Sequence, residues 1–164
     1  MAHRTPLDAT DVRILRCLRK NARMSNKDLA RQVGLAPSSC LERVRRLRLA
    51  RVLTGYHADI DPDALGIGLQ AMVAVRLSRH ARADVEAFEA HLEGLAEVVT
   101  LFHVAGANDY LVHVAVRDSA HLRDLALTAF TERPEVDHIE TQLIFHHQRN
   151  HELPVYLDVD EDRD

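Results

Sequence analysis

The chain has 164 residues, of which 46% are hydrophobic, and a formal net charge of −4. That length suits one domain or two small ones with a packed core, and the sequence contains no run of about 18 apolar residues that would cross a membrane. The N-terminal stretch lacks the apolar core of a secretory signal, and Cys17 and Cys40 lie in apolar periodic segments, so we expect reduced core cysteines in a cytoplasmic protein.

The charge is distributed unevenly along the chain. Residues 1–60 hold 13 Lys and Arg against 5 Asp and Glu, a balance of +8, whereas residues 61–164 hold 8 against 20, a balance of −12. Five arginines fall within the short stretch from Ala36 to Tyr56. A basic front half in an acidic chain indicates an anionic partner for that half.

Two helices are predicted at the start of the basic half. Apolar residues recur there at helical spacing, and Asp8 or Thr10 is placed to cap the first helix. Ser25, with Asp28 three residues later, fits a capping box for the second helix, and Gly34 is placed to end that helix in a left-handed turn.

A third helix follows, and it carries much of the positive charge. Pro37 suits its first position, and its apolar pattern runs to about Leu49. Two short helices joined by a tight turn that contains glycine form a helix-turn-helix arrangement, whose second helix fits the DNA major groove. The alternative is a solvated, arginine-rich helix face. The face expected to dock on the other helices carries Cys40, Leu41, Val44 and Leu47. The opposite face carries Ser38, Ser39, Glu42 and Arg46, with Arg43 and Arg45 on its flanks.

The rest of the chain alternates between strand and helix patterns. Residues 52–60 are β-prone and predict a short strand, and residues 61–66 are rich in turn formers that mark a boundary. The order β-α-β-β-α-β that follows is that of the ferredoxin-like split unit. Its strands are predicted at residues 69–78, 98–104, 110–116 and 136–146, and its helices at about 82–94 and 119–132.

The predicted sheet is apolar on both faces, although the two helices of this fold cover only one. Exposed apolar patches of such size are unusual on monomers, so the second face predicts self-association. On the first strand Met72 and Ala74 oppose Val73 and Val75, and on the second strand Val98, Phe102 and Val104 oppose Val99 and Leu101.

The motifs resemble those of a known family. The segment SNKDLARQVGLAPSSCLERVRRL, then GY, then GANDY within a β-α-β-β-α-β half, is similar to the Lrp/AsnC (feast/famine) transcription regulators from about Leu7 to about Arg149. The resemblance implies an α+β protein with an N-terminal helix-turn-helix (winged-helix-like) domain and a C-terminal ferredoxin-like βαββαβ domain. The expected divisions are a DNA-binding domain at 1–51, a strand and hinge at 52–66, an effector-binding and oligomerisation domain at 67–149, and an acidic tail at 150–164.

The resemblance also implies the function and its residues. It implies a regulator rather than an enzyme, which is cytoplasmic and nucleoid-associated in a bacterium or archaeon and binds double-stranded DNA. It further implies dimers through the C-terminal sheets, tetramers or octamers of these, and a free amino acid or related metabolite as effector. Carried over by position, the DNA-binding residues are Ser25, Ser38, Ser39, Arg43, Arg45, Arg46 and Arg51. The effector-binding residues are His103, Val104, Gly106, Ala107, Asn108, Asp109, Tyr110 and Thr141.

The chemistry of the loop around Gly106 agrees with an amino-acid ligand. Asp109 offers an acceptor for an ammonium group, and backbone N–H groups around Gly106 offer donors for a carboxylate. Glycine also allows positive φ and a close approach of the backbone. The alternative is an ordinary hairpin turn, in which the Asp109 side chain bonds to its own backbone.

Three positions depart from the family pattern. Ala36 stands where a serine cap is usual before the proline, and the loss of a cap costs about 0.5–2 kcal/mol. Arg51 stands where a glycine usually ends the third helix, so we expect this helix to end differently. Glu135 stands after Pro134 where the pattern often has glycine.

Other readings remain open. One is an effector-independent architectural regulator that bends DNA, and another is a ferredoxin-like metabolite-binding module or small enzyme. The best histidine cluster is His146, His147 and His151, but the first two point to opposite faces of a continued strand, so we expect no metal site and no cofactor. The tail from Asp158 onward is predicted to be disordered.

Overall fold

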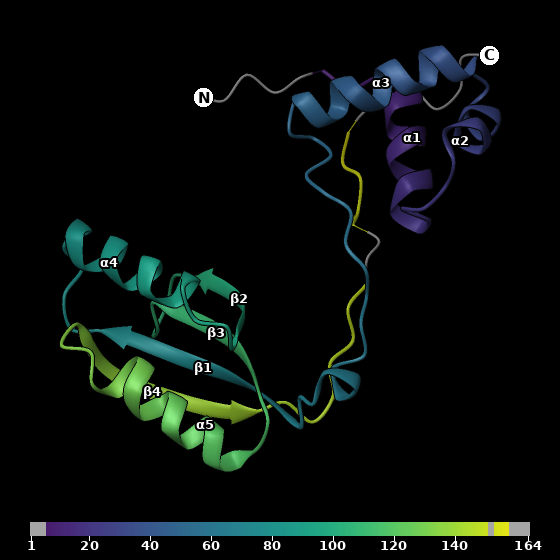
Figure 1. Cartoon of the computed structure of the whole chain (residues 1–164). Coiled ribbons are helices and arrows are strands. Elements are labelled where there is room, and N and C mark those ends of the chain that lie inside the picture. The colour runs from purple at the N-terminus through teal and green to yellow at the C-terminus, as the bar shows by residue number, and fades with distance from the viewer. Residues whose placement is uncertain (1–5, 151–152, 158–164) are drawn as a thin grey trace. The chain divides into compact units, whose positions relative to one another are not determined.

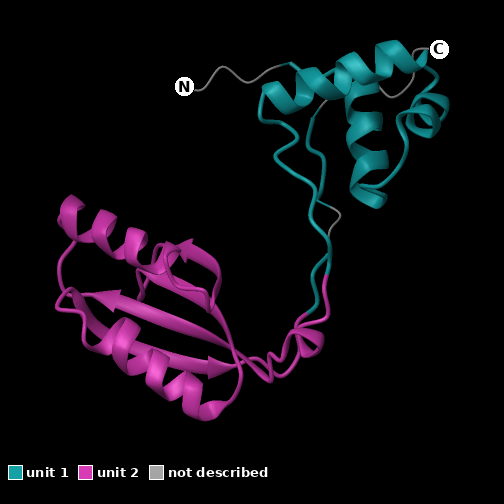
Figure 2. Cartoon of the chain, viewed as in Figure 1, with its two compact units in different colours: residues 1–59, 148–164 teal, residues 60–147 magenta. Residues whose placement is uncertain are grey.

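The computed structural model describes residues 6–150 and 153–157 (Figure 1). The chain divides into two compact units: one holds the residues up to Asp59 together with those from Gln148 onward, and the other runs from Ile60 to His147 (Figure 2). The first unit is helical and the second combines helices with a sheet. Among the described residues, no helix has the length and apolar character needed to span a membrane.

Three helices, each close to its predicted position, make up the helical unit. They are α1 (Ala9–Lys20), α2 (Asn26–Val33) and α3 (Pro37–Leu49). Asp8 caps α1 as predicted, because its carboxylate accepts a hydrogen bond from the Asp11 amide at 2.8 Å while the Asp11 carboxylate accepts from the Asp8 amide. This reciprocal capping box satisfies two amides that the first turn leaves without helical partners.

The ends of α2 and the start of α3 also follow the sequence. Ser25 caps α2 by accepting from the Asp28 amide at 3.1 Å, and Gly34 ends it with a φ of 71°. Ala36 gives α3 no side-chain cap, and Pro37 fills the first helical position.

The helices pack around a small apolar core, and one prediction about that core is wrong. Cys40 and Leu47 of α3 are fully buried, and Val44 packs at the edge of the cluster. Leu41, however, is 58% exposed, because it lies about 100° around the helix from Cys40 and so points away from α1 and α2. The core residues are Ile14, Leu18, Leu29, Ala30, Val33, Cys40 and Leu47.

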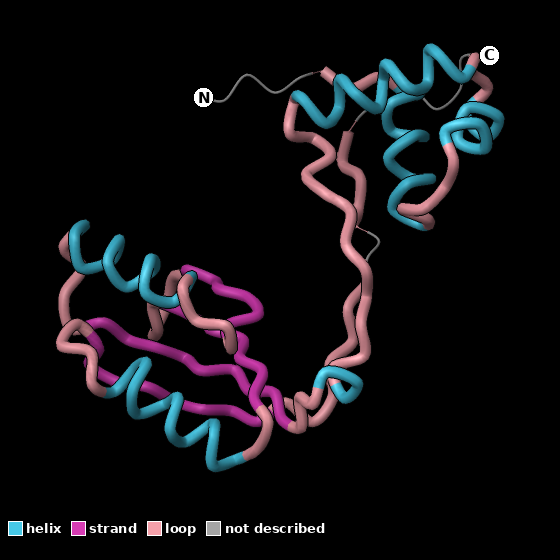
Figure 3. The backbone as a smooth tube through the Cα atoms, in the orientation of Figure 1, coloured by secondary structure: helices cyan, strands magenta, loops and turns pink. Residues whose placement is uncertain are grey.

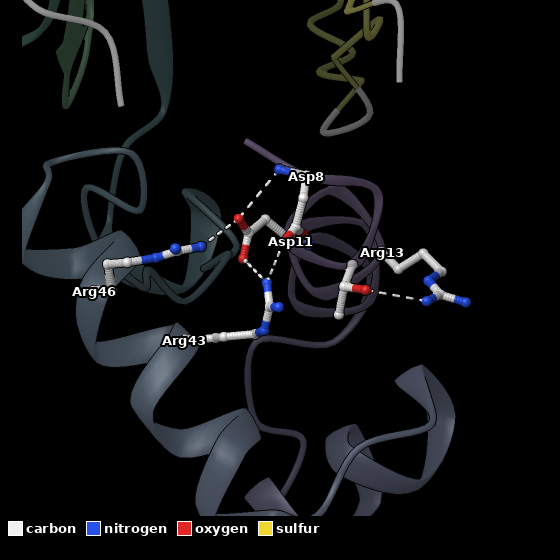
Figure 4. A network of polar contacts seen from close by, with 6 residues as sticks. Asp8, Asp11, Arg13, Arg43 and Arg46 are labelled. Carbon is white, nitrogen blue, oxygen red and sulfur yellow. Dashed lines mark hydrogen bonds and ion pairs between the residues drawn. The ribbon is translucent and has the colours of Figure 1, made fainter. Parts of the chain in front are cut away.

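A group of ion pairs, which we name the α1–α3 ion-pair cluster (Asp8, Asp11, Arg43 and Arg46), joins the third helix to the start of the first (Figure 4). Arg43 Nη1 lies 2.6 Å from Asp8 Oδ2 and 3.0 Å from Asp11 Oδ1. Arg46 Nη2 pairs with the other oxygen of Asp11. The Asp11 side chain is fully buried, and a buried carboxylate is tolerated only when it is paired and hydrogen-bonded. The cluster therefore fixes the side of α3 that faces α1.

The exposed member of the cluster is also held in its charged form. Burial acts to raise the pKa of Asp8, but hydrogen bonds from the Arg43 guanidinium and the Asp11 amide outweigh it and lower that pKa. Hydrogen bonds to the Asp8 and Asp11 carboxylates raise the pKa of Arg43, although burial acts to lower it.

The end of α3 contradicts the expectation that an arginine at position 51 would alter it. Arg51 adopts a φ of 56° and is the one non-glycine residue with positive φ in the described part of the chain. The Val52 amide bonds to the Leu47 carbonyl at 3.0 Å and the Arg51 amide to the Arg48 carbonyl at 3.0 Å. These two bonds form a Schellman ending of the helix. They hold Arg51 in the left-handed conformation that a glycine usually adopts at this position.

The strand predicted at residues 52–60 is absent: this segment is a loop, and no described segment pairs with it in a ladder (Figure 3). A β-prone sequence forms a strand only when a partner satisfies its backbone groups. Instead, Leu53 and Tyr56 line one pocket of the helical unit together with Leu153 and Leu157. The predicted tail thus begins with a stretch that belongs to the helical unit. The disorder predicted from Asp158 onward falls on residues outside the described ones.

The second unit is the predicted ferredoxin-like arrangement. Its antiparallel sheet has the order β2-β3-β1-β4, and both helices cover one face (Figure 1). The strands are β1 (Leu69–Leu77), β2 (Val98–His103), β3 (Tyr110–Val116) and β4 (Val136–Leu143). The helices are α4 (Arg82–Glu93) and α5 (Ser119–Leu125), the latter continued by π-helical turns over Ala126–Thr131.

The face without helices is less apolar than predicted, and the first residue of β2 lies on the other face of the sheet from the predicted one. A bulge between Val98 and Thr100 shifts the register of β2, so Val98 and Leu101 both pack against the helix-covered core. The predicted opposition of these two residues is therefore wrong, because a bulge adds one residue to the two-residue alternation. The uncovered face carries Gln70, Met72, Ala74, Arg76, Phe102, Leu111 and His113.

Glu135 needs no glycine-like backbone. It is buried, its carboxylate accepts from Arg133 Nε at 2.8 Å, and its carbonyl accepts from the Ser78 amide at 2.8 Å. Burial acts to raise the pKa of Glu135, but its own backbone amide and Arg133 lower it overall.

The left-handed Arg51 predicts that Arg51→Gly stabilises the helical unit. Removing Cβ relieves a backbone strain of about 1–2 kcal/mol in the folded state. Glycine also makes the unfolded chain more flexible, which opposes this gain by about 0.4–1 kcal/mol. Urea unfolding should show a net gain of a few tenths to about 1 kcal/mol. Arg48→Gly, inside α3, is the matched control and should lose about 1 kcal/mol. A loss of stability in Arg51→Gly would contradict this account.

The ion-pair cluster predicts that Asp11→Asn destabilises the protein. The neutral amide keeps the shape but loses two charge-assisted bonds, so the free energy of unfolding should fall by about 1–3 kcal/mol. Asp124→Asn is the control, because Asp124 and its partner Arg123 have side chains 65% and 72% exposed and such pairs contribute little. Equal denaturant midpoints for Asp11→Asn and the wild type would show that the cluster does not hold α3.

Candidate nucleic-acid interface and ligand-binding loop

The helix α3 presents a solvent-facing surface that contains several of the predicted DNA-binding residues. Ser38 and Ser39 are exposed in its first turn, and Arg45 is exposed nearly two turns further on. Arg51 is exposed directly after the helix. This surface therefore joins hydroxyl groups at the helix N-terminus with unburied guanidinium groups, which suits contact with phosphates and base edges.

Two of the arginines that we expected to contact DNA are paired within the fold. Arg43 and Arg46 extend toward α1, where they bind Asp8 and Asp11 (Figure 4). Their side chains are 31% and 48% exposed. A guanidinium that is committed to a carboxylate has fewer donors for a bidentate base contact, so the geometry gives these two a role in positioning α3.

Ser25 is also engaged in the fold. Its hydroxyl accepts from the Asp28 amide and donates to Asp28 Oδ2 at 2.6 Å. Beside it, Asn26 Nδ2 donates to the carbonyl of Pro37 at 2.8 Å and so connects the start of α2 to the start of α3. The sequence offered no signal for the Asn26 contact.

Leu41 and Arg48 are surface residues that the sequence reading assigned no DNA-binding role. They lie on α3 with Leu49, and the three residues line a shallow groove together with Val44 and Arg45. A helical wheel centred on Cys40 and Leu47 alone, instead of on every apolar residue, places Leu41 outside the core.

The loop of residues 104–109 joins β2 to β3 in the predicted hairpin. The Val104 amide bonds to the Asp109 carbonyl at 2.8 Å, and the Asp109 amide bonds to the Val75 carbonyl at 2.9 Å. Gly106 has a φ of 135°, and a Cβ there would meet no atom within 4 Å. Within the described chain, no acceptor is bound to the amides of Gly106, Ala107 and Asn108. The loop tip is thus open, with donors available to an anion.

The Asp109 carboxylate is bound within the fold. Its Oδ2 accepts from the Leu77 amide at 2.7 Å and its Oδ1 lies 2.7 Å from His80 Nε2. Burial acts to raise the pKa of Asp109, but the Leu77 amide and His80 lower it overall. Asp109 therefore braces the hairpin against the end of β1. This is neither the free ammonium acceptor nor the self-bonded turn that the sequence suggested.

His103 and Tyr110 are paired at the two strand ends that the loop joins, and Tyr110 is fully buried. Their rings stack at 4.6 Å, and the Tyr110 hydroxyl donates to Glu89 Oε1 at 2.9 Å. Burial raises the pKa of Tyr110, and Glu89 raises it further, so the hydroxyl stays protonated. His80 and Glu89 are contacts that the sequence reading missed, because each lies on a different element from the loop.

Thr141 does not join this group in a single chain. Thr141 lies on β4 and pairs with Val73 of β1, whereas the loop bonds to β1 at Val75. In the sheet, β1 and β3 separate β4 from β2, the strand that leads into the loop. The described residues contain no group of three or more His, Cys, Asp or Glu side chains arranged to hold a metal ion. Of the histidine cluster, His151 lies outside the described residues.

Comparison with known proteins agrees with this division into a helical unit and a sheet unit. Residues 7–48 match the AsnC-type helix-turn-helix domain, and residues 70–152 match the Lrp/AsnC ligand binding domain. The HTH-type transcriptional regulator AldR of Mycolicibacterium smegmatis is 43% identical over 143 residues, which cover 87% of this chain and 84% of the relative. The leucine-responsive regulatory protein of Haemophilus influenzae is 38% identical over 138 residues, which cover 84% of this chain and 83% of that protein.

Solved structures agree in fold as well. A transcriptional regulator of Neisseria meningitidis, solved as an L-Met complex, has a TM-score of 0.81 at 30% identity and covers 88% of this chain and 94% of its own. AsnC of Escherichia coli has a TM-score of 0.79 at 26% identity, and the match covers 89% of this chain and 98% of the AsnC chain. The chain therefore belongs to the Lrp/AsnC family of transcriptional regulators, with an AsnC-type helix-turn-helix domain and a ligand-binding domain.

Proposed function

We propose that the protein binds specific sites on double-stranded DNA through α3 and that a free amino acid, bound at the 104–109 loop, modulates this binding. The observation that carries the proposal is the exposed surface of α3, with Ser38, Ser39 and Arg45, on a helix whose orientation is fixed by buried ion pairs. The protein acts in the cytoplasm as a nucleoid-associated regulator, without catalysis, metal or cofactor.

Within the DNA-binding surface, the roles differ by residue. Ser38 and Ser39 lie where the first turn of a recognition helix meets base edges or phosphates. Arg45 is the base-reading arginine, and Arg51 contacts a phosphate beyond the helix end. Arg43 and Arg46 position α3, and Ser25 caps α2 near the same surface.

For the effector, the supporting features are the open amides at Gly106, Ala107 and Asn108. Amides that converge on one point bind carboxylates. His103 offers a half-exposed ring beside the loop and the buried Tyr110 supports that ring from within the fold, while Val104 and Asp109 hold the loop closed. The relative solved as an L-Met complex supports an amino acid as the ligand class. Thr141 would reach such a ligand only from another chain.

The uncovered sheet face supports a dimer. Met72, Ala74, Leu111 and Phe102 form its apolar part, and Phe102 is 48% exposed. Burying this face against a second copy would remove that area from water, and pairs of dimers would build tetramers or octamers. Sedimentation of the full chain across concentrations measures the assembly directly.

The DNA-binding surface predicts opposite behaviour for neighbouring arginines. In a gel shift on the gene's own upstream DNA, Arg45→Ala should weaken binding by about 1–3 kcal/mol and relax the preference at one base pair. Arg43→Ala should instead lower the stability of the fold and leave the dependence of binding on salt unchanged, because it is assigned no phosphate.

Arg82→Ala is the control for this comparison, because its side chain is 90% exposed and lies on α4 in the other unit. It should bind DNA as the wild type does. An Arg43→Ala variant with a reduced salt slope, beside an Arg45→Ala variant with unchanged affinity, would reverse the assignment of the two arginines.

The loop geometry predicts that Gly106→Ala abolishes effector binding without unfolding the protein. In thermal unfolding with each of the twenty amino acids, one or a few should raise the wild-type midpoint, since a ligand at 100 times its Kd stabilises by about 2.7 kcal/mol. Alanine strains the loop at this positive φ, so the shift should vanish in Gly106→Ala and persist in Gly94→Ala, where φ is −82°. No shift with any amino acid, together with a gel shift that none of them alters, would favour the effector-independent regulator.

A further inference from the structure

One side of α3 presents exposed leucines among arginines. Leu41 is 58% exposed and Leu49 is 77% exposed. With Val44, Arg45 and Arg48, they line a shallow groove of about 560 Å³. Large apolar side chains this exposed on a highly charged helix call for a partner that accepts both apolar contact and positive charge.

The ion-pair cluster determines that this side faces away from the other helices. At 100° per residue, Leu41 lies roughly 140–160° around α3 from Arg43 and Arg46, which are bound at α1. The core contact is made by Cys40 and Leu47, which are fully buried. Leu41 therefore shares the outward surface with Ser38 and Arg45 and lies one turn before Arg45.

The charges beside Leu41 discriminate between occupants of the groove. In a symmetric contact, a second copy of this chain would bring its own Arg45 and Arg48 against the same pair, and like charges facing each other weaken an interface. Another apolar protein surface would desolvate both guanidinium groups without partners. Duplex DNA offers phosphates to the arginines and, in its major groove, the C5-methyl group of thymine to the leucine.

We propose that Leu41 is a specificity-determining residue whose side chain contacts a thymine methyl group in the major groove. The proposal rests on the proposed function, because it requires α3 to enter that groove. Arg45, one turn further along, reaches the neighbouring base pair or phosphate. The helix therefore makes an apolar contact and a cationic contact at adjacent positions of the DNA.

The test removes the methyl group and the leucine separately. A duplex selected by the full-length chain from a random library is remade with deoxyuridine in place of each thymine in turn, which deletes the methyl group and keeps the base pairing. For the wild type, deoxyuridine at the thymine that Leu41 contacts should weaken binding about fourfold. This is the affinity expected from the burial of one methyl-sized group. Leu41→Ala should bind the thymine duplex more weakly and show no further loss at that position.

Leu65→Ala is the matched control, because Leu65 is 63% exposed and lies in the other unit. It should bind as the wild type does and keep the deoxyuridine loss, and thermal melts should show that both leucine variants fold. Wild-type binding that no deoxyuridine weakens, or a loss that persists in full in Leu41→Ala, would overturn the proposal. A chain that selects no duplex at all would refute the proposed function, and this inference with it.

Discussion

A single buried carboxylate, that of Asp11, decides how the third helix is presented. A carboxylate buried in an apolar interior needs paired, hydrogen-bonding partners, and two arginines of α3 supply them. Because those arginines lie three residues apart, satisfying one carboxylate fixes the rotation of α3 about its own axis. The surface that carries Ser38, Arg45 and Leu41 is then directed to solvent. The positive charge of this segment thus has two tasks, one within the fold and one outside it.

The hairpin loop of the sheet unit follows a similar principle. Asp109 is bound by an amide of β1 and by His80, so the loop is braced from below while its tip keeps open amides. In both places a carboxylate that the sequence suggested for binding, or left unassigned, holds a proposed binding surface in position. The proposed ligand would then be met by the backbone and the neighbouring side chains.

Much of this could be predicted from the sequence, and the failures have identifiable physical causes. The helices of the basic half were predictable because their caps, glycine and proline act locally within a few residues. The positions of the strands along the chain followed from the alternation of apolar residues, and the sheet arrangement followed from the order of strands and helices. The positions of Arg43 and Arg46 were not predictable, because they depend on Asp8 and Asp11 more than 30 residues away. The bulge in β2 reversed a face assignment by one residue, and the left-handed Arg51 required bonds that only the folded helix end supplies.

The chain passes between the two units twice, and this connectivity has a mechanical consequence. One pass leaves the helical unit after Asp59 and enters β1, and the other leaves β4 and returns from Gln148 onward (Figure 2). Both passes start from neighbouring strands at the same end of the sheet, where Ala71 pairs with Leu143. Because β1 and β4 are hydrogen-bonded neighbours, any displacement of one along the other also displaces the starting points of the two connections against each other. A rearrangement of this one strand pair would therefore reach both connections at once.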